Sequence, residues 1–252
     1  MIETINLLLF GQKRKIRIYL PADYYVMGKR YPVIYMHDGQ NVFDSEEAIG
    51  GVSLELHDYL AENKVELMVV AIDQNPEERL NEYCPWRDGE FCSRVLGKRS
   101  TTGGKGKEYV EFIVNELKPL IDEKYRTDKN ETYMAGISLG ALITTYAACT
   151  YPYIFKRIAG VSSAFYRNQE ELEEMLKAAD LTEVEKIYLD CGIKEVPEEE
   201  RISELFLQSN KAIHEMIKQK GIKAEVKLVD GALHNYQSFK KRIPDVFTYL
   251  LS

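Results

Sequence analysis

Apolar and polar positions alternate with a two-residue period at the start of the chain, in residues 4–10 and 15–21. This alternation predicts two β-strands with one buried face each, joined by a turn at Gly11. Further along, short and nearly continuous apolar runs predict strands that are buried on both faces. These runs are 31–40, 66–73 and 131–137, and the segments 155–164, 185–192 and 223–231 are predicted to be further strands.

Between these strands, apolar residues recur at helical intervals, which predicts amphipathic helices. The segments are 54–63, 107–125, 140–151, 168–179, 200–221 and 236–252, the last adjusted at Pro244. Alternating strands and helices predict an α/β fold with a mostly parallel central sheet, helices on both faces and antiparallel N-terminal strands. No repeat or linker divides the chain, so we expect residues 1–252 to form a single domain. Residues 74–104 look long and irregular, which is often a sign of a functional loop.

The composition narrows the class of protein. A net charge of −7 argues against nucleic acid as a partner, because an acidic surface repels phosphates. No apolar run approaches the roughly 20 residues that span a bilayer, and the N-terminus lacks the features of a secretory signal. The four cysteines form no CxxC or Cys/His cluster, so neither disulfides nor a zinc site is expected. We therefore expect a cytoplasmic protein without a membrane segment, metal or organic cofactor.

One short segment points to chemistry. Residues 136–140, Gly-Ile-Ser-Leu-Gly, place a small polar residue between an apolar strand and an apolar helix. They match G-x-S-x-G, the nucleophile elbow, in which the serine occupies a sharp strand-to-helix turn. A purely structural turn is the alternative, but the position within an alternating α/β chain favours Ser138 as a nucleophile.

An elbow serine needs a base that accepts its proton, and in enzymes of this kind the chain order is serine, acid, histidine. His37 and His57 precede the serine, and His214 lies within a helix, where we expect a partly exposed position. His234 follows a predicted strand and precedes the last helix. The pattern therefore indicates His234 as the base.

The residues leave the acid open. Asp190 and Glu195 both follow or end the predicted strand 185–192, and either could be aimed at the histidine. Asp230 is a third candidate, more typical of a turn. The oxyanion hole is expected to use two backbone N–H groups. One belongs to Leu139, and the other belongs to Gln40, in the loop that begins at the polar end of segment 31–40. Asp38 and Asn41 of that loop either line the substrate pocket or support the loop by side-chain hydrogen bonds.

Together these segments resemble the putative esterase family, which includes relatives of esterase D, enterochelin esterase and feruloyl or acetylxylan esterases within the α/β-hydrolases. The resemblance rests on "VIYMHDGQNVFD", "AIDQNPEERLNEYCPW", "YMAGISLGAL", "YLDCGIKE" and "LHNYQSF", in this order, and extends from about residue 14 to the end. It implies the α/β-hydrolase fold. It also implies that the acid follows a G-x-x-[DE] pattern, which falls on Gly192 to Glu195.

The resemblance implies a serine esterase that acts on a small-molecule ester through Ser138, His234 and Glu195, with short-acyl, carbohydrate and phenolic esters as candidate substrates. It further implies that the stretch around Arg79 and Trp86 folds over the site, so Trp86 is a candidate substrate contact; structural packing is the alternative. A thioesterase or peptidase with the same triad, or a non-catalytic binding protein, are the competing interpretations. The sequence leaves the acyl and alcohol specificity and the oligomeric state open.

Overall fold

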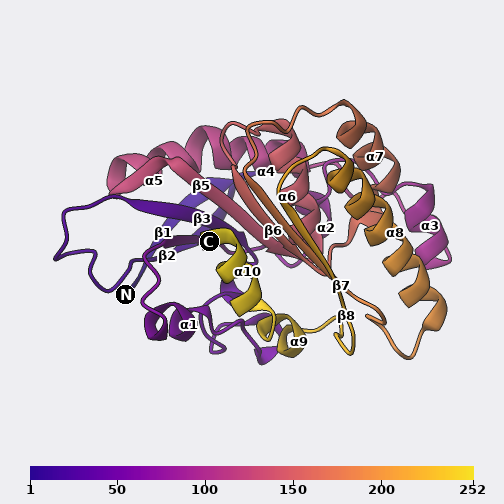
Figure 1. The fold of residues 1–252 in the computed structure, drawn as a ribbon, viewed down its shortest axis with the longest axis horizontal. Coiled ribbons are helices and arrows are strands. Elements are labelled where there is room, and N and C mark those ends of the chain that lie inside the picture. Colours follow the sequence, from indigo (N-terminus) through magenta and orange to yellow (C-terminus); the bar gives the residue numbers. More distant parts are fainter.

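The computed structural model describes residues 1–252 and contains one eight-stranded sheet with the strand order β1-β2-β4-β3-β5-β6-β7-β8 (Figure 1). The chain first forms the half of the sheet that contains β1, β2, β3 and β4. It then crosses to the other side of β3 and adds β5 to β8 there, so the strand order reverses at β3. The strands are β1 (Ile2–Leu9), β2 (Gln12–Tyr19), β3 (Tyr31–His37), β4 (Met68–Ile72), β5 (Thr127–Ile137), β6 (Arg157–Val161), β7 (Lys186–Gly192) and β8 (Ala224–Val229).

The first two strands form the antiparallel edge that their alternation predicts. β1 and β2 pair with Ile5 opposite Ile16, and β2 continues antiparallel onto β4. All remaining neighbours, from β4 through β3, β5, β6 and β7 to β8, are parallel. The predicted fold class, a mostly parallel sheet with an antiparallel N-terminal edge, is therefore confirmed.

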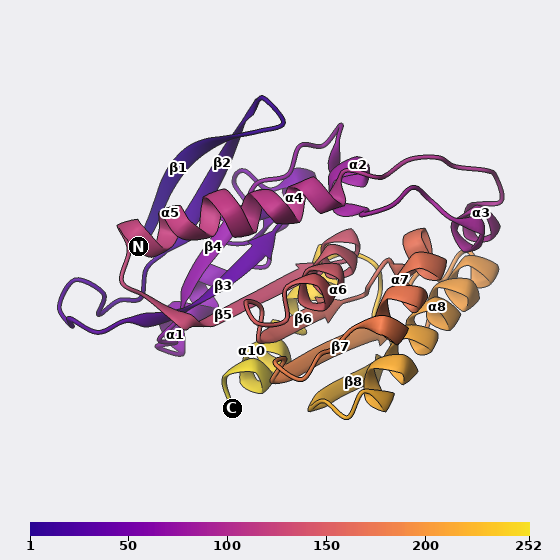
Figure 2. The same ribbon diagram turned by 90° about the horizontal axis from the view of Figure 1, so that it is seen from above.

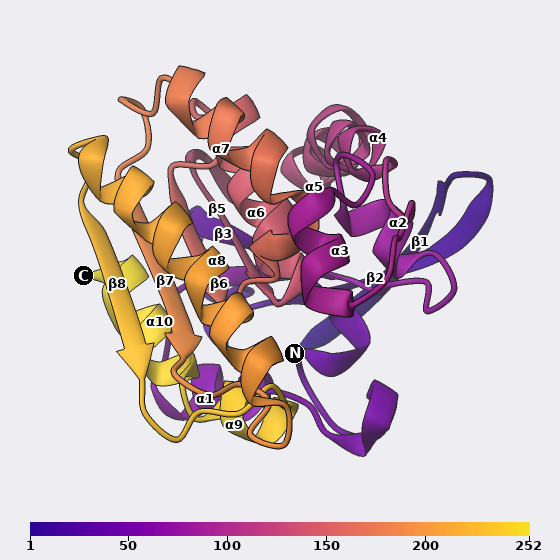
Figure 3. The ribbon, with the colours of Figure 1, turned by 90° about the vertical axis from the view of Figure 1, so that its right-hand side faces the viewer.

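Helices cover both faces of the sheet (Figure 2). One face carries α1 (Leu56–Glu62), α9 (Tyr236–Lys240) and α10 (Ile243–Leu251). The other face carries the remaining long helices, including α6 (Leu139–Thr150) and α8 (Glu200–Gln219). Two apolar clusters, of 42 and 22 buried residues, fill the two layers. The continuous apolar runs of the central strands follow from this arrangement, because each of these strands is buried on both faces. Figure 3 shows α8 (Glu200–Gln219) lying across β7 and β8.

Three predicted segments differ in detail. Residues 107–125 form α4 (Gly106–Phe112), a π-helical turn (Ile113–Leu117) and α5 (Lys118–Lys124) rather than one regular helix. The last predicted helix is divided into α9 and α10, and Pro244 occupies the first turn of α10, where its missing N–H costs no hydrogen bond. Residues 74–104 are less irregular than predicted, since they contain α2 (Arg79–Tyr83) and α3 (Glu90–Leu96).

The topology also determines where a site can form. Parallel strands bring their carboxyl ends to the same edge of the sheet, and ligands of open α/β sheets bind outside that edge. The segments after β3, β4, β5, β7 and β8 therefore converge there. α6 (Leu139–Thr150) begins at this edge and is buried along nearly its whole length. No helix of the structure has both the length and the apolar character to span a bilayer.

Candidate active site

The turn between β5 and α6 has the strained geometry of a nucleophile elbow. Ser138 has φ 59° and ψ −115°, a conformation that L-residues rarely adopt. The flanking Gly136 is required by close packing, because a Cβ there would lie 2.1 Å from the carbonyl oxygen of Gly140. The backbone N–H of Ser138 donates to Val161 O, which ties the turn to β6. The serine hydroxyl is thus held at the carboxyl end of β5, at the start of a helix.

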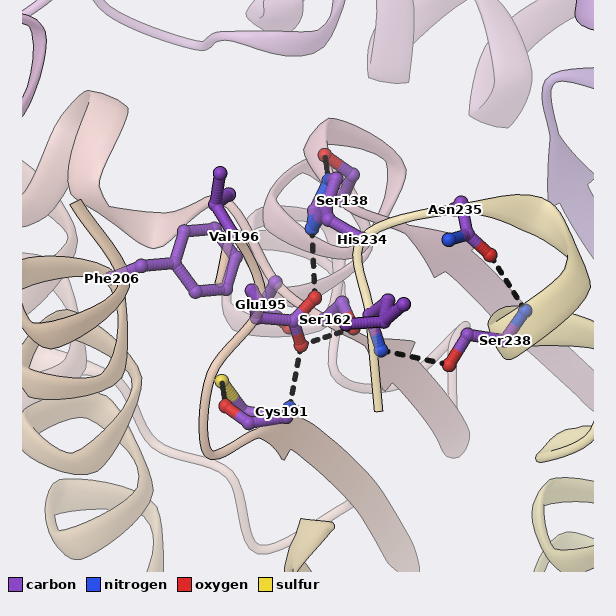
Figure 4. Close-up of polar contacts among 12 residues, drawn as sticks. Ser138, Ser162, Cys191, Glu195, Val196, Phe206, His234, Asn235 and Ser238 are labelled. Atoms are coloured by element: carbon purple, nitrogen blue, oxygen red, sulfur yellow. Dashed lines mark hydrogen bonds and ion pairs between the residues drawn. The ribbon is translucent and has the colours of Figure 1, made fainter. Parts of the chain in front are cut away.

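His234 lies between this hydroxyl and a carboxylate (Figure 4). His234 Nε2 is 3.0 Å from Ser138 Oγ, and Nδ1 is 3.0 Å from Glu195 Oε2. The backbone N–H of His234 also donates to Glu195 O at 3.0 Å, so main chain and side chain join the same two loops. Phe206 and Phe239 contact the imidazole edge-on, with centroid distances of 5.3 and 5.2 Å. The imidazole is therefore fixed by packing and by two hydrogen bonds.

The structure separates the two candidate carboxylates. Glu195 faces His234, whereas Asp190 points toward Arg242, whose Nη1 donates to Asp190 Oδ1 at 2.5 Å. Burial opposes ionisation of Glu195, but hydrogen bonds from His234 and Ser162 outweigh it and hold the pKa of this carboxyl below its usual value. Burial raises the pKa of Asp190, although Arg242 opposes that shift. Asp230, the third candidate, makes no recorded contact with the histidine.

The loop after β3 lies opposite the elbow and begins with a second strained residue. Asp38 has φ 57° and ψ 47°, in the left-handed region, and its backbone N–H donates to Tyr83 Oη at 3.1 Å. The following residue has to be glycine, because a Cβ on Gly39 would lie 2.7 Å from the backbone of β4 and Asp73. Gln40 Oε1 accepts a hydrogen bond from Gln74 N at 2.9 Å, which joins this loop to the one after β4.

Two backbone donors lack partners within their own helices. Gln40 is in the first turn of a 3₁₀-helix (Gly39–Asn41), and Leu139 is the first residue of α6. The first N–H groups of a helix have no intrahelical acceptor and are free to bind an anion or an oxygen atom. Both amides that the sequence indicates for an oxyanion hole therefore belong to elements that start at the edge of the sheet where Ser138 lies.

A cavity of about 270 Å³ opens over Ser138 and His234. Seven of its eleven lining residues are polar or charged, but apolar atoms contribute the larger part of the lining surface. Arg79, from α2, forms one wall, and its Nε and Nη2 donate to Asp38 Oδ1 and Oδ2 at 2.7 and 2.8 Å. The other lining residues are Asn41, Ile49, Gln74, Ile137, Asn235, Tyr236 and Phe239. The cavity can thus hold a compact polar group next to the serine.

Not every residue expected at the pocket reaches it. Trp86 does not line the cavity; its ring packs edge-on against Tyr146 of α6 at 5.4 Å, so it belongs to the packing of the 74–104 segment. Asn41 does line the cavity, but its Nδ2 donates to Ile49 O and Val52 O, which holds the loop in place. The contacts of Trp86 therefore favour structural packing, whereas Asn41 both lines the cavity and supports its loop.

One histidine differs from its prediction, and several neighbours of the site were not predicted. His214 is buried, not partly exposed, and burial lowers its pKa to about 4. Tyr236 lies on the cavity wall. It was not predicted as a site residue, although it follows His234 by only two positions. Ser162 and Arg242, which contact Glu195 and Asp190, carried no sequence signal, since they come from different ends of distant elements.

Comparisons with known proteins identify the family of this chain. The family model described as "Putative esterase" matches residues 9–250. YbbA of Bacillus subtilis is 27% identical over 243 residues, which cover 94% of this chain and 92% of YbbA. Ferri-bacillibactin esterase BesA of the same organism is 24% identical over 145 residues, 55% of this chain and 50% of BesA.

The fold is also similar to the folds of solved structures. An IroE-like serine hydrolase from Shewanella oneidensis superposes with a TM-score of 0.79 at 19% identity, over 98% of this chain and 78% of the other. At this level of identity the likeness establishes the fold, while the family match covers nearly the whole sequence. The chain therefore belongs to the putative esterase family and is a carboxylic ester hydrolase of the α/β-hydrolase fold.

Proposed function

We propose that this enzyme cleaves its ester by a serine mechanism, with Ser138 as nucleophile, His234 as general base and acid, and Glu195 as the residue that orients the imidazole. The observation that carries the proposal is the pair of 3.0 Å contacts, from Ser138 Oγ to His234 Nε2 and from His234 Nδ1 to Glu195 Oε2. These are the nucleophile–base and base–acid distances that such catalysis requires.

In the first half of the cycle, Ser138 Oγ attacks the ester carbonyl carbon while His234 Nε2 accepts the hydroxyl proton. The tetrahedral intermediate collapses as the bond to the alcohol oxygen breaks, and the imidazolium protonates that oxygen. In the second half, His234 removes a proton from water, the hydroxide attacks the acyl-serine, and Ser138 is released with its proton restored. Glu195 stabilises the imidazolium in both halves without itself becoming protonated.

The backbone N–H groups of Leu139 and Gln40 are proposed to bind the oxyanion. Both belong to the first turn of a helix, where the donors have no internal acceptor. The ion pair of Asp38 with Arg79 and the hydrogen bond from Asp38 N to Tyr83 Oη hold the second donor loop in one conformation before substrate binds. A preorganised donor of this kind is worth about 10²–10³ in kcat. The cycle needs no cofactor.

The cavity favours a substrate with polar groups close to the ester. Seven of its eleven lining residues are polar or charged, and Arg79 Nη1 is not used by the Asp38 pair. A long unbranched acyl chain would exceed the cavity of about 270 Å³. The name of BesA adds esters of iron-binding siderophores to the short-acyl, carbohydrate and phenolic esters that deserve assay.

The direct test is the Ser138→Ala variant with p-nitrophenyl acetate. We expect loss of turnover, loss of covalent labelling by a fluorophosphonate, and an unchanged thermal unfolding midpoint. Ser163→Ala is the matched control, because Ser163 is a neighbouring buried serine whose hydroxyl has no hydrogen-bond partner. Turnover by Ser138→Ala at the wild-type rate would refute the proposal.

A further inference from the structure

Ser162 lies directly behind the proposed triad and contacts its acid. It follows β6, is fully buried, and has a φ of 49°, in the left-handed region. Its Oγ lies 2.6 Å from Glu195 Oε1 and 2.9 Å from Arg242 Nη2 (Figure 4 shows the contact with Glu195). A buried serine held in a strained backbone conformation between a carboxylate and a guanidinium is not explained by packing alone.

The direction of these hydrogen bonds follows from the chemistry of the groups. A guanidinium group can only donate, so Ser162 Oγ accepts from Arg242. The hydroxyl has a single proton, and an ionised carboxylate can only accept, so that proton is donated to Glu195 Oε1. Arg242 thereby determines which way the serine hydroxyl points. A hydroxyl that accepts from a cation is also a stronger donor to the next acceptor, because the bonds polarise one another.

Asp190 completes the arrangement by neutralising Arg242. Its Oδ1 accepts from Arg242 Nη1 at 2.5 Å, and its Oδ2 accepts from Tyr188 Oη at 3.1 Å. All of these side chains are buried. Because Asp190 balances the guanidinium charge, the charge of Glu195 stays available to the imidazole. This accounts for two carboxylates at the end of β7, of which only one faces His234.

Glu195 is consequently held at one oxygen and free at the other. Oε1 accepts from Ser162 Oγ and from Gly192 N, at 2.6 and 2.5 Å, and Oε2 is left for His234 Nδ1. Rotation of the carboxylate would break two buried charge-assisted hydrogen bonds. We propose that Ser162 is a positioning residue, oriented by Arg242, which fixes the Glu195 carboxylate so that its second oxygen faces His234. This inference rests on the proposed catalytic role of Ser138, His234 and Glu195.

The test compares Ser162→Ala with wild type in hydrolysis of p-nitrophenyl acetate. We expect kcat to fall about 10- to 100-fold, the factor that one hydrogen bond to a charged group is worth. KM should stay within about twofold, because Ser162 does not line the cavity. Ser162→Gly serves as a second variant, since glycine adopts the φ of this position without strain and also lacks the hydroxyl. Ser163→Ala, which removes a buried hydroxyl one residue away, should leave kcat unchanged.

A double-mutant cycle separates positioning from a general structural effect. If Ser162 acts through Glu195, then Ser162→Ala should have no further effect on kcat in a Glu195→Gln background. An equal loss of kcat in both backgrounds, or a kcat of Ser162→Ala and Ser162→Gly within twofold of wild type, would overturn the inference. Failure of the proposed function is distinguishable, because Ser138→Ala would then retain turnover whatever Ser162 does.

Discussion

Glu195 Oε2 lies 3.0 Å from Nδ1 of His234, although the two residues are 39 positions apart in the chain. The contact forms because β7 and β8 are parallel neighbours, so the loops that follow them emerge side by side. The same two loops are joined by the backbone hydrogen bond from His234 N to Glu195 O. The position of the carboxylate relative to the ring is therefore a property of the sheet as well as of the two side chains.

Replacing the carboxylates of Glu195 and Asp190 by amides, one at a time, should distinguish their roles. Glu195→Gln should lower kcat by up to about 10⁴-fold, because an amide cannot hold the imidazole in the required tautomer or stabilise its charge. Asp190→Asn should leave kcat within about tenfold and instead lower the free energy of unfolding by about 3 kcal/mol, since Arg242 becomes a buried, unpaired charge. Steady-state kinetics and chemical denaturation of both variants are the measurements. The reverse pattern would assign the acid to Asp190.

The ion pair between Arg79 and Asp38, which holds the loop after β3, can be tested with the Arg79→Met variant. This change removes both hydrogen bonds to Asp38 and leaves a nearly buried carboxylate without its partner, so the loop that carries Gln40 should lose its fixed conformation. We expect kcat to fall by about 10²-fold, the effect of losing one oxyanion donor. Arg99→Met, on the exposed part of the 74–104 segment, is the control and should be indistinguishable from wild type. Unchanged kinetics of Arg79→Met would show that the ion pair is dispensable.

The two glycines of the elbow should differ in tolerance. Gly136→Ala places a Cβ 2.1 Å from Gly140 O, a backbone atom that cannot move without opening the turn. We expect this variant to lose at least about 3 kcal/mol of unfolding free energy. Gly140→Ala meets side-chain atoms alone, His37 Cβ at 3.3 Å and Asp38 Oδ2 and His37 Cδ2 at 3.6 Å, and gains helix propensity, so its stability should change by no more than about 1 kcal/mol. Thermal and urea unfolding would check this, and equal stabilities of the two variants would contradict the packing argument.

His214 should make the fold sensitive to acid. Burial lowers its pKa to about 4, while in the unfolded chain it titrates near 6.5, so the unfolded state binds the extra proton first as the pH falls. The stability that depends on the neutral ring is present above pH 6.5 and is lost as the pH falls toward 4. His214→Leu should therefore reduce the loss of unfolding free energy between pH 7.5 and pH 5 by about 2 kcal/mol. Urea unfolding at the two pH values measures this loss, and an equal loss in His214→Leu and wild type would contradict the prediction.

The size of the cavity predicts a preference among acyl groups. With a volume of about 270 Å³, it should accept acetyl and butyryl esters and disfavour octanoyl esters of the same alcohol. We expect kcat/KM for p-nitrophenyl esters to fall at least about tenfold from acetate to octanoate. The series also includes a thioester and an anilide with the acetyl group, to rank the ester against the alternative acyl donors. A rate that rises with chain length would show that the acyl group binds elsewhere.

Local patterns in the sequence were sufficient for the architecture and for part of the site. Continuous apolar runs identified the central strands because those strands are buried on both faces, and alternation identified the antiparallel edge. The elbow was readable because a sharp strand-to-helix turn needs small residues at fixed offsets around Ser138. His234 was predicted from the chain order serine, acid, histidine and from its place between the last strand and the last helix. The strands and the elbow depend on a few adjacent residues, so the sequence by itself contained them.

The remaining features depend on atoms that are distant in the chain. Asp190 and Glu195 were equivalent candidates on the residues alone, and the position of Arg242 at the start of α10 separates them in space. The burial of His214 depends on which face of α8 meets the sheet. Ser162 acquired its partners only when the ends of β6, β7 and α10 came together. Side-chain partnership across elements is set by packing, and no periodicity or local spacing encodes it, so only the tertiary structure could decide these points.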